Sequence, residues 1–184
     1  MTTTTKKAHW TDQLVDVGAC DDALEWCKTK RTAKSAWKTC KRGDWLLWIA
    51  AKLAWRQGGQ GSPAHRAVVL AACACARLAL PSWDKRYRND RRVLDCIETT
   101  ERWARGEAGV TLEDVRKARA AAAVAAYAAA AYAYAAAAAA ADAAAADAAY
   151  AYAAAAAAAA RSLALAQCAD IVRKMIPMPT MVTK

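Results

Sequence analysis

The chain of 184 residues has the length of one domain, or of one domain with an extended element. Its 27 Lys and Arg outnumber 17 Asp and Glu, so the formal net charge is +10, and alanine fills 54 positions, 33 of them between residues 120 and 160. Abundant Trp, Leu and Cys exclude a disordered polyelectrolyte, and the scarcity of β-branched residues excludes a β-sandwich. We predict an all-α fold, a compact bundle of about six short helices followed by a long Ala-rich helix or helical hairpin.

Start and stop signals divide residues 1–110 into the short helices of this bundle. Capping residues mark the starts, and glycine or proline marks most of the ends. The strongest start is Ser62-Pro63, which combines a hydroxyl N-cap with proline at the first helical position. The predicted helices and their N-caps are 11–18 (Thr11), 21–30 (Asp21 or Asp22), 32–43 (Thr32), 45–57 (Asp44), 62–80 (Ser62) and 89–106 (Asn89 or Asp90).

Residues 111–176 form a second, Ala-rich region. Thr111–Asp114 resembles a capping box with Asp in the place of Glu or Gln, and no Gly or Pro follows it before residue 177. One continuous helix would be ~95 Å long, so the chain either projects as a rod or folds back near Asp142 or Asp147. Residues 177–184 are expected to form a flexible tail.

The tyrosines of the Ala-rich region repeat after 18 residues, which is about five whole turns of an α-helix. Tyr132 is therefore expected to lie above Tyr150, and Tyr134 above Tyr152, in two rows on a smooth alanine surface. Another helix can approach such a surface closely, from the same chain or from a second copy, and we expect a homo-oligomer. Low-complexity expansion of a helix-forming codon run explains the repeat equally well.

The predicted helix 32–43 carries the most informative charge pattern. Seven basic residues and no acidic one lie between Lys28 and Arg42, although like charges on one helix face repel. The excess predicts an anionic partner; the alternative is a solvated face neutralised by carboxylates of the preceding helices. The candidate residues, which share an arc of about 100°, are Arg31, Lys34, Lys38, Lys41 and Arg42.

Two further groups of residues are candidates for binding an anion. Gly58–Gly61 leads into a helix N-terminus, where anions bind readily, but the segment lacks the Lys-Ser/Thr ending of a nucleotide P-loop. The candidates there are His65 and Arg66. A second basic cluster precedes the predicted helix 89–106 and opposes its dipole, and it consists of Lys85, Arg86, Arg88, Arg91 and Arg92.

Tryptophan and cysteine are assigned to the core. Six of the eight tryptophans lie between Trp10 and Trp55, and the predicted helix 45–57 is apolar nearly all round, which favours packing over stacking on bases. Cys73 and Cys75 point about 200° apart on a helix, an arrangement that does not suit one metal ion. The sequence has no Ser/His/Asp order and no paired carboxylates in an apolar setting. We therefore predict no enzyme, no cofactor and no metal site.

The sequence also predicts where the protein is located. Its first ten residues lack the apolar run of a signal peptide, and the apolar runs outside the Ala-rich region are shorter than the ~20 residues that cross a bilayer. Seven scattered cysteines match no disulfide framework. We expect a soluble cytoplasmic protein that does not bind a membrane.

Several segments, in order along most of the chain, resemble a family of immunity proteins found beside bacterial toxin genes and in phage genomes. The resemblance implies a helical protein that neutralises a partner by binding it inside a bacterial host cell, and it carries over no catalytic motif. The matching segments are Gly18–Trp26, Ala36–Cys40, Arg42–Trp48, Ala71–Leu80, Ile97–Glu107, the Ala/Tyr/Asp-rich region and Cys168–Pro177.

Two functions fit these observations. The first is a non-catalytic binding protein of the immunity or anti-defence type, which masks an acidic protein effector stoichiometrically. The alternative is a protein that sequesters a nucleic acid or a cyclic signalling nucleotide, with its cations on phosphates and exposed tryptophans on bases. Inhibitors that imitate the substrate of a nuclease tend to be acidic, so the net charge of +10 argues against a nuclease as the partner.

Overall fold

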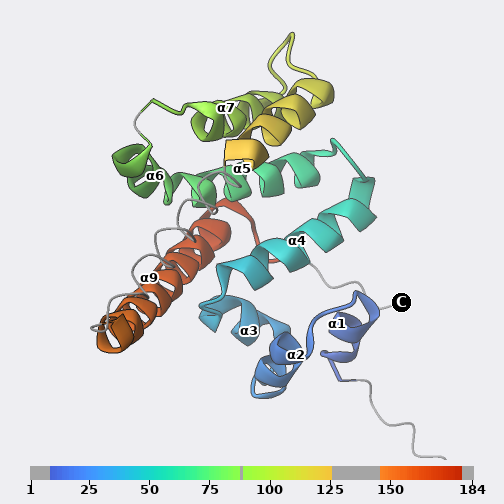
Figure 1. Cartoon of the computed structure of the whole chain (residues 1–184). Helices are drawn as coiled ribbons and strands as arrows, with labels where there is room; N and C mark the ends of the chain where they lie inside the picture. Colours follow the sequence, from blue (N-terminus) through green and yellow to red (C-terminus); the bar gives the residue numbers. More distant parts are fainter. Residues whose placement is uncertain (1–8, 88, 126–145, 180–184) are drawn as a thin grey trace, which may run out of the picture.

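The computed structural model describes residues 9–87, 89–125 and 146–179, and over these ranges the chain is all-α, without strands (Figure 1). The predicted fold class is confirmed. A further helix, at 112–125, follows α7. The labelled helices are α1 (Asp12–Asp16), α2 (Asp21–Lys28), α3 (Ala33–Thr39), α4 (Gly43–Gly58), α5 (Pro63–Arg77), α6 (Leu80–Arg86), α7 (Arg92–Arg105) and α9 (Ala146–Met175).

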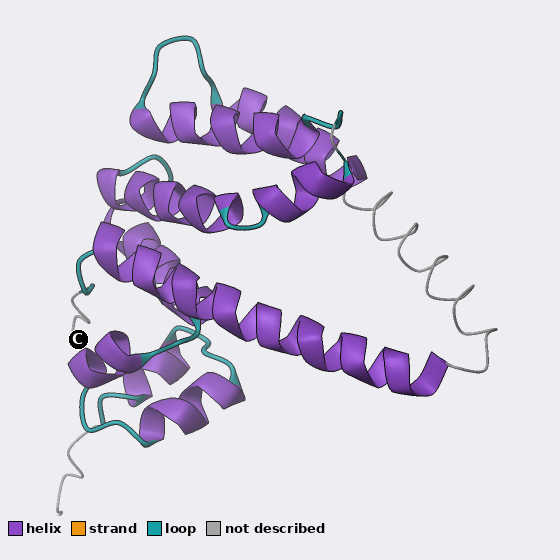
Figure 2. Ribbon diagram, turned by 90° about the vertical axis from the view of Figure 1, so that its left-hand side faces the viewer, coloured by secondary structure: helices purple, strands orange, loops and turns teal. Residues whose placement is uncertain are grey.

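The helices stack in layers around α5 (Figure 2). Helix α7 packs on one side of α5, with helix 112–125 beside it, and α4 and α9 pack on the other side. The short helices α1, α2 and α3 form the last layer, beyond α4. Among the described helices, none is long and apolar enough to cross a bilayer.

The central core lies where α4, α5 and α9 meet. Gly43 allows this crossing, because a Cβ there would overlap the side chain of Cys168 and lie 2.7 Å from the backbone nitrogen of Ala169. The end of the Ala-rich region is thus part of the core that the first region builds. The buried residues of this core are Cys40, Leu46, Ala50, Ala54, Val68, Ala71, Ala169, Val172 and Ile176.

Several predicted caps are present. The hydroxyl of Thr32 accepts a hydrogen bond from the backbone N–H of Ser35, and that of Ser62 accepts one from His65. Thr111 and Asp114 form the reciprocal bonds of a capping box, at 3.2 and 2.8 Å. Gly106 ends α7 in the left-handed conformation, with φ at 76°. These ends form locally, so the sequence predicts them well.

Other predicted helix ends and caps differ from the structure. Helix α3 ends at Thr39 instead of at residue 43, and the guanidinium of Arg173 binds the carbonyl oxygens of Trp37 and Cys40 at this end, at 3.2 and 2.7 Å. Helix α4 begins at Gly43, two residues earlier than predicted, and Asp44 is not its N-cap; Arg42 binds that carboxylate instead. Helix α1 begins without a side-chain cap from Thr11, whose hydroxyl contacts the His9 ring instead.

One helix of the structure, α6, was not predicted. The prediction stops the fifth helix before Pro81 and continues as a loop, whereas α5 ends at Arg77 and α6 begins at Leu80. Pro81 lies in the first turn of α6, where a missing N–H costs nothing. Helix α7 begins at Arg92, and the carboxylate of Asp90 accepts the N–H of that residue at 3.1 Å.

The Ala-rich region does not continue as one straight rod from residue 112. Helix 112–125 lies beside α7, and the last turns of α9 pack against α4 and α5 on the other side of the bundle (Figure 2). Of the two proposed reversal points, Asp142 falls outside the described ranges, and Asp147 lies in the first turn of α9 as it is described. Tyr132 and Tyr134 also fall outside them. Tyr150 and Tyr152 belong to α9, but their side chains are not among those described, so the tyrosine rows remain a prediction.

Candidate anion-binding face and adjoining cavity

Helix α3 has two unlike faces. Ala36 and Cys40 are buried against the neighbouring helices, whereas Lys34 and Lys38 are exposed. This division agrees with the helical spacing of the sequence. Because α3 ends at Thr39, Lys41 follows the helix and Arg31 precedes it, and both are exposed as well. We call the four exposed cations the basic face, and they are Arg31, Lys34, Lys38 and Lys41.

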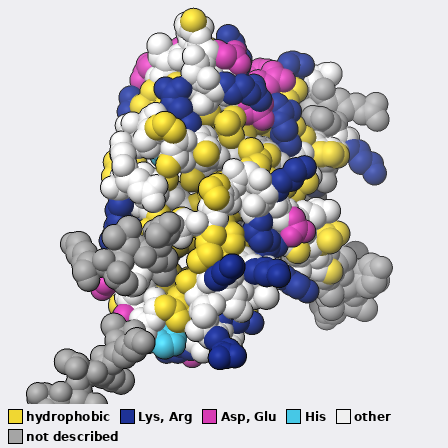
Figure 3. All heavy atoms as spheres, turned by 180° about the vertical axis from the view of Figure 1, so that it is seen from behind, with side chains coloured by type: hydrophobic (Ala, Val, Ile, Leu, Met, Phe, Trp, Pro, Cys, Tyr) yellow, Lys and Arg dark blue, Asp and Glu magenta, His cyan; other side chains and the backbone are white. Residues whose placement is uncertain are grey.

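The cations of the basic face have no carboxylate within ion-pair distance among the described residues. Glu25, the acidic residue that precedes them most closely in the sequence, pairs with Lys28 instead, at 2.6 Å. Several Lys and Arg side chains lie on the lower part of the surface in Figure 3, among polar and hydrophobic atoms and with few acidic ones beside them. The mutual repulsion on the basic face is therefore not offset by ion pairs within the described protein.

Arg42, the fifth candidate, is already bound by other residues of the protein. Its Nε and Nη2 donate to the two carboxylate oxygens of Asp44 at 2.9 and 2.7 Å, and its guanidinium lies 4.3 Å from the ring centroid of Trp45. The hydrogen bonds from Arg42 lower the pKa of Asp44, although partial burial of this carboxyl opposes the shift. Arg42 thus links the end of the basic face to the start of α4. Among the described residues, its Nη1 atom remains free to donate to a further acceptor.

The second basic cluster is partly neutralised. Arg92 binds Asp90 at 2.7 Å, and Arg91 lies 3.4 Å from Asp95 and 3.8 Å from Glu98. The other members differ in position: Lys85 and Arg86 are exposed in the last turn of α6, and Arg88 falls outside the described residues. The cluster is therefore a mixed-charge surface around the start of α7.

His65 and Arg66 are engaged at the helix start that they were predicted to offer to an anion. The Nδ1 atom of His65 is 3.2 Å from the backbone nitrogen of Gly61 and accepts its N–H. Arg66 donates to the carbonyl oxygens of Gly61 and Trp103, at 3.0 and 3.3 Å, and its guanidinium lies 5.3 Å from the centroid of the Trp103 ring. Both side chains connect the Gly-rich turn to α7.

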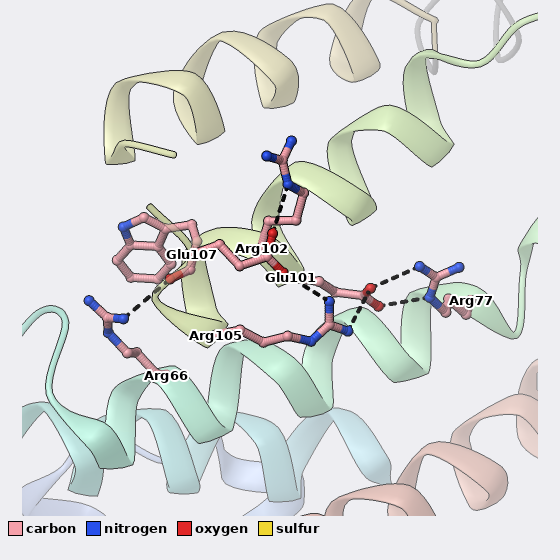
Figure 4. A network of polar contacts seen from close by, with 7 residues as sticks. Arg66, Arg77, Glu101, Arg102, Arg105 and Glu107 are labelled. Atoms are coloured by element: carbon pink, nitrogen blue, oxygen red, sulfur yellow. Dashed lines mark hydrogen bonds and ion pairs between the residues drawn. The ribbon is translucent and has the colours of Figure 1, made fainter. Parts of the chain in front are cut away.

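The arginines between α5 and α7 form a closed network (Figure 4). Arg77 binds Glu101 through two hydrogen bonds, at 2.7 and 2.9 Å, and Arg105 binds the same carboxylate at 3.2 Å. The Glu101 side chain is only 11% exposed, and its pKa is lowered mainly by the hydrogen bonds from Arg77. Nearby, Arg102 binds Glu107 at 2.9 Å. Cations in this part of the molecule hold helices together.

A partly open cavity of about 480 Å³ lies between α1, α2, α3 and α4. Five tryptophans line it, together with apolar residues, three thiols, the Arg42–Asp44 pair, and Met178 and Pro179 of the C-terminal segment. The sequence analysis assigned these indoles to packing and did not predict a cavity. The available signal was the concentration of tryptophan before residue 56. The tryptophans of the cavity are Trp10, Trp26, Trp37, Trp45 and Trp48.

Most cysteines behave as small apolar residues. Cys27, Cys40 and Cys73 are buried, Cys20 is exposed, and none of the seven forms a disulfide. Burial raises the pKa of Cys27 and of Cys73 to about 11, and that of Cys75 to about 12. The structure groups no three His, Cys, Asp or Glu side chains in a metal-binding arrangement within the ranges that it describes.

Comparison of the chain with protein-family models, with curated proteins and with solved structures returned no match. The resemblance to immunity proteins therefore stays a prediction that rests on the sequence segments alone.

Proposed function

We propose that this protein is a non-catalytic binding protein of the immunity or anti-defence type, which masks an acidic protein partner by stoichiometric binding. The observation that carries the proposal is the basic face. Four cations lie together and exposed around α3, without a carboxylate of the described chain beside them. A like-charged cluster that the fold leaves uncompensated is stabilised by an anionic partner.

A protein partner suits the surroundings of the basic face better than a nucleic acid does. Binding to single strands without sequence preference combines cations with exposed aromatic rings on which bases stack. The tryptophan that is most exposed among the described residues, Trp55 at 57%, lies near the end of α4, whereas α3 precedes the start of that helix. Trp37, the indole of α3 itself, is partly buried on the cavity side. The basic face thus offers charge without a stacking ring.

Charge reversal tests this proposal. The variant Lys34→Glu/Lys38→Glu/Lys41→Glu is compared with a control that changes net charge equally at exposed sites elsewhere, Arg56→Glu/Lys117→Glu/Lys174→Glu. Fluorescence anisotropy with labelled poly-L-glutamate, at about 0.05 and 0.15 M salt, measures affinity for an acidic polypeptide. We expect the first variant to bind at least about tenfold more weakly than the wild type, and the control to lose less than about threefold.

The same titration with a single-stranded oligonucleotide separates the two functions. Affinity that is higher for the oligonucleotide than for the polypeptide, and that falls steeply with salt, contradicts the proposal in favour of nucleic-acid sequestration. Equal losses in the two charge-reversal variants also contradict it, because binding then follows net charge and not the position of the basic face.

A further inference from the structure

We infer that the tryptophan-lined cavity is a binding site for a small, flat, largely apolar organic molecule that carries an acidic group. The site is separate from the basic face, and the inference does not depend on the function proposed above. It rests on the size, the lining and the charges of the cavity.

The size and lining are those of a ligand pocket. Sites for small molecules typically enclose about 300–1,000 Å³, with mostly apolar walls and a few polar groups, and the cavity of about 480 Å³ falls within this range. Five indoles from α2, α3, α4 and the segment before α1 contribute to its walls. Trp26 and Trp45 lie with ring centroids 6.1 Å apart and planes tilted by 58°, so two rings from different helices are in contact there. Aromatic walls of this kind favour a ligand with rings of its own.

The polar groups of the cavity favour an acid. Lys30 Nζ lies 4.7 Å from the ring centroid of Trp26, and the Arg42 guanidinium lies 4.3 Å from that of Trp45. Two of the wall tryptophans thus each have a cation beside the ring. Asp44, the acidic residue of the lining, is already bound by Arg42 through two hydrogen bonds. A ligand anion in the cavity can therefore reach Arg42 Nη1 without displacing a free carboxylate, whereas Lys30 lies beside the Trp26 ring outside the lining.

The indole N–H groups provide additional donors. Trp10 Nε1 donates to the carbonyl oxygen of Lys30 at 3.2 Å and closes one edge of the site. The other four indoles of the cavity have no acceptor among the described residues, yet none of their nitrogens is a fully buried atom without a partner. Their N–H groups therefore retain some exposure and are not used by the described protein, so they are available to an oxygen-bearing ligand.

The test uses 8-anilino-1-naphthalenesulfonate, a fluorescent aromatic anion, and N-phenyl-1-naphthylamine, its neutral analogue. Titrations on the full chain at about 0.15 M salt follow dye emission and energy transfer from tryptophan. We expect saturable binding at one site per chain, with the anion bound about tenfold more tightly than the neutral dye. Cooperative thermal unfolding of the dye-bound protein separates this site from the diffuse dye binding of a loosely packed state.

Two variants locate the site. Ala23→Leu/Ala33→Leu enlarges two wall residues of the cavity, and Ala72→Leu/Ala76→Leu makes the same change on the exposed side of α5. We expect the first pair to weaken anion binding about tenfold or more and the second to change it less than about twofold. Arg42→Gln/Asp44→Asn removes the rim pair without changing net charge, and the preference for the anion is then expected to fall below about threefold.

Three results would overturn the inference. They are the absence of saturable dye binding to the folded protein, equal binding by the two leucine variants, and equal affinity of the wild type for the two dyes. The basic-face variant provides the separation from the proposed function, because it is expected to bind the dye within about threefold of the wild type. A loss of dye binding in that variant shows that the cavity and the basic face act as one site, which also contradicts the inference of a separate site.

Discussion

The layer that contains α3 and the layer formed by α5 and α7 use cationic side chains in opposite ways. Between α5 and α7, Arg77 and Arg105 converge on the nearly buried carboxylate of Glu101 (Figure 4). Around α3, Lys34 and Lys38 point away from the core and meet no carboxylate of the described chain. Both layers are rich in cations in the sequence. The second uses them in ion pairs with Glu101, whereas the basic face has no ion pair with the described residues and is therefore available for a partner.

A substitution at the contact between α4 and α9, which lies between these two layers, is expected to have the largest effect on the free energy of unfolding. Gly43→Ala forces a Cβ into the side chain of Cys168 and the backbone of Ala169, and overpacking of this kind costs about 2–3 kcal/mol of unfolding free energy. Denaturant unfolding followed by circular dichroism measures the loss. Alanine has a higher helix propensity than glycine, so a stabilised Gly43→Ala variant would contradict the close crossing.

The second largest loss of stability is expected from breaking the ion pairs between α5 and α7. Glu101→Gln removes the charge that Arg77 and Arg105 share and is expected to cost about 1–2 kcal/mol at neutral pH, because the arginines are partly exposed. The matched change Glu113→Gln removes an exposed carboxylate beside Arg116 and should cost less than about 0.5 kcal/mol.

The pH dependence of this pair has a defined sign. The folded state lowers the pKa of Glu101 below its ordinary value of 4.5. Its contribution is therefore complete above that ordinary value and is lost as the pH falls through the lower pKa of the folded state. The difference in stability between wild type and Glu101→Gln should shrink on acidification. A difference that stays constant with pH would show that the glutamine acts through packing instead of charge.

The basic face predicts a smaller effect on stability than on binding. Lys34→Glu/Lys38→Glu/Lys41→Glu should change the free energy of unfolding by less than about 0.5 kcal/mol, because these side chains are exposed and have no partner among the described residues. Thermal unfolding of the variant beside the wild type measures this. A loss comparable to that of Glu101→Gln would remove the contrast between the two layers.

The smallest effect on the fold is expected from chemical modification of the thiols. Cys20 is exposed, whereas burial raises the pKa of Cys27 and of Cys73 to about 11. Two pKa units above the ordinary value of 9.0 lower the thiolate fraction at neutral pH about 100-fold, and only the thiolate is alkylated. Iodoacetamide at about pH 8, with peptide mass mapping over time, should label Cys20 first. Faster labelling of Cys27 than of Cys20 would show that the cavity region opens readily.

The sequence predicts many features that depend on neighbours within a few residues. The all-α class, the Thr32 and Ser62 caps, the Thr111–Asp114 capping box and the end of α7 at Gly106 all follow from local hydrogen bonds and backbone conformation. The same rules predict a loop after Pro81, because proline is common both after the end of a helix and in the first turn of one. In the structure, Pro81 lies in the first turn of α6.

Within the candidate site, the sequence predicts the cations and their common direction but not which of them are bound by other residues of the protein. Arg42 and Lys41 both fall within the predicted arc of about 100°, yet Arg42 is bound to Asp44 and Lys41 is exposed. The early end of α3 separates the two, and Arg173, 133 residues away from Cys40 in the chain, binds the carbonyl oxygen at this end. No local pattern contains that contact.

By itself, the sequence determined the helical class, the excess of positive charge and the two-sided character of α3, because each depends on composition and on spacing within one helix. Only the tertiary structure decided which cations are neutralised, where α9 packs and that five tryptophans surround a cavity. The physical reason is that ion pairing and enclosure depend on distances between segments. Packing between helices, such as that of α4 against α5 and α9, sets those distances.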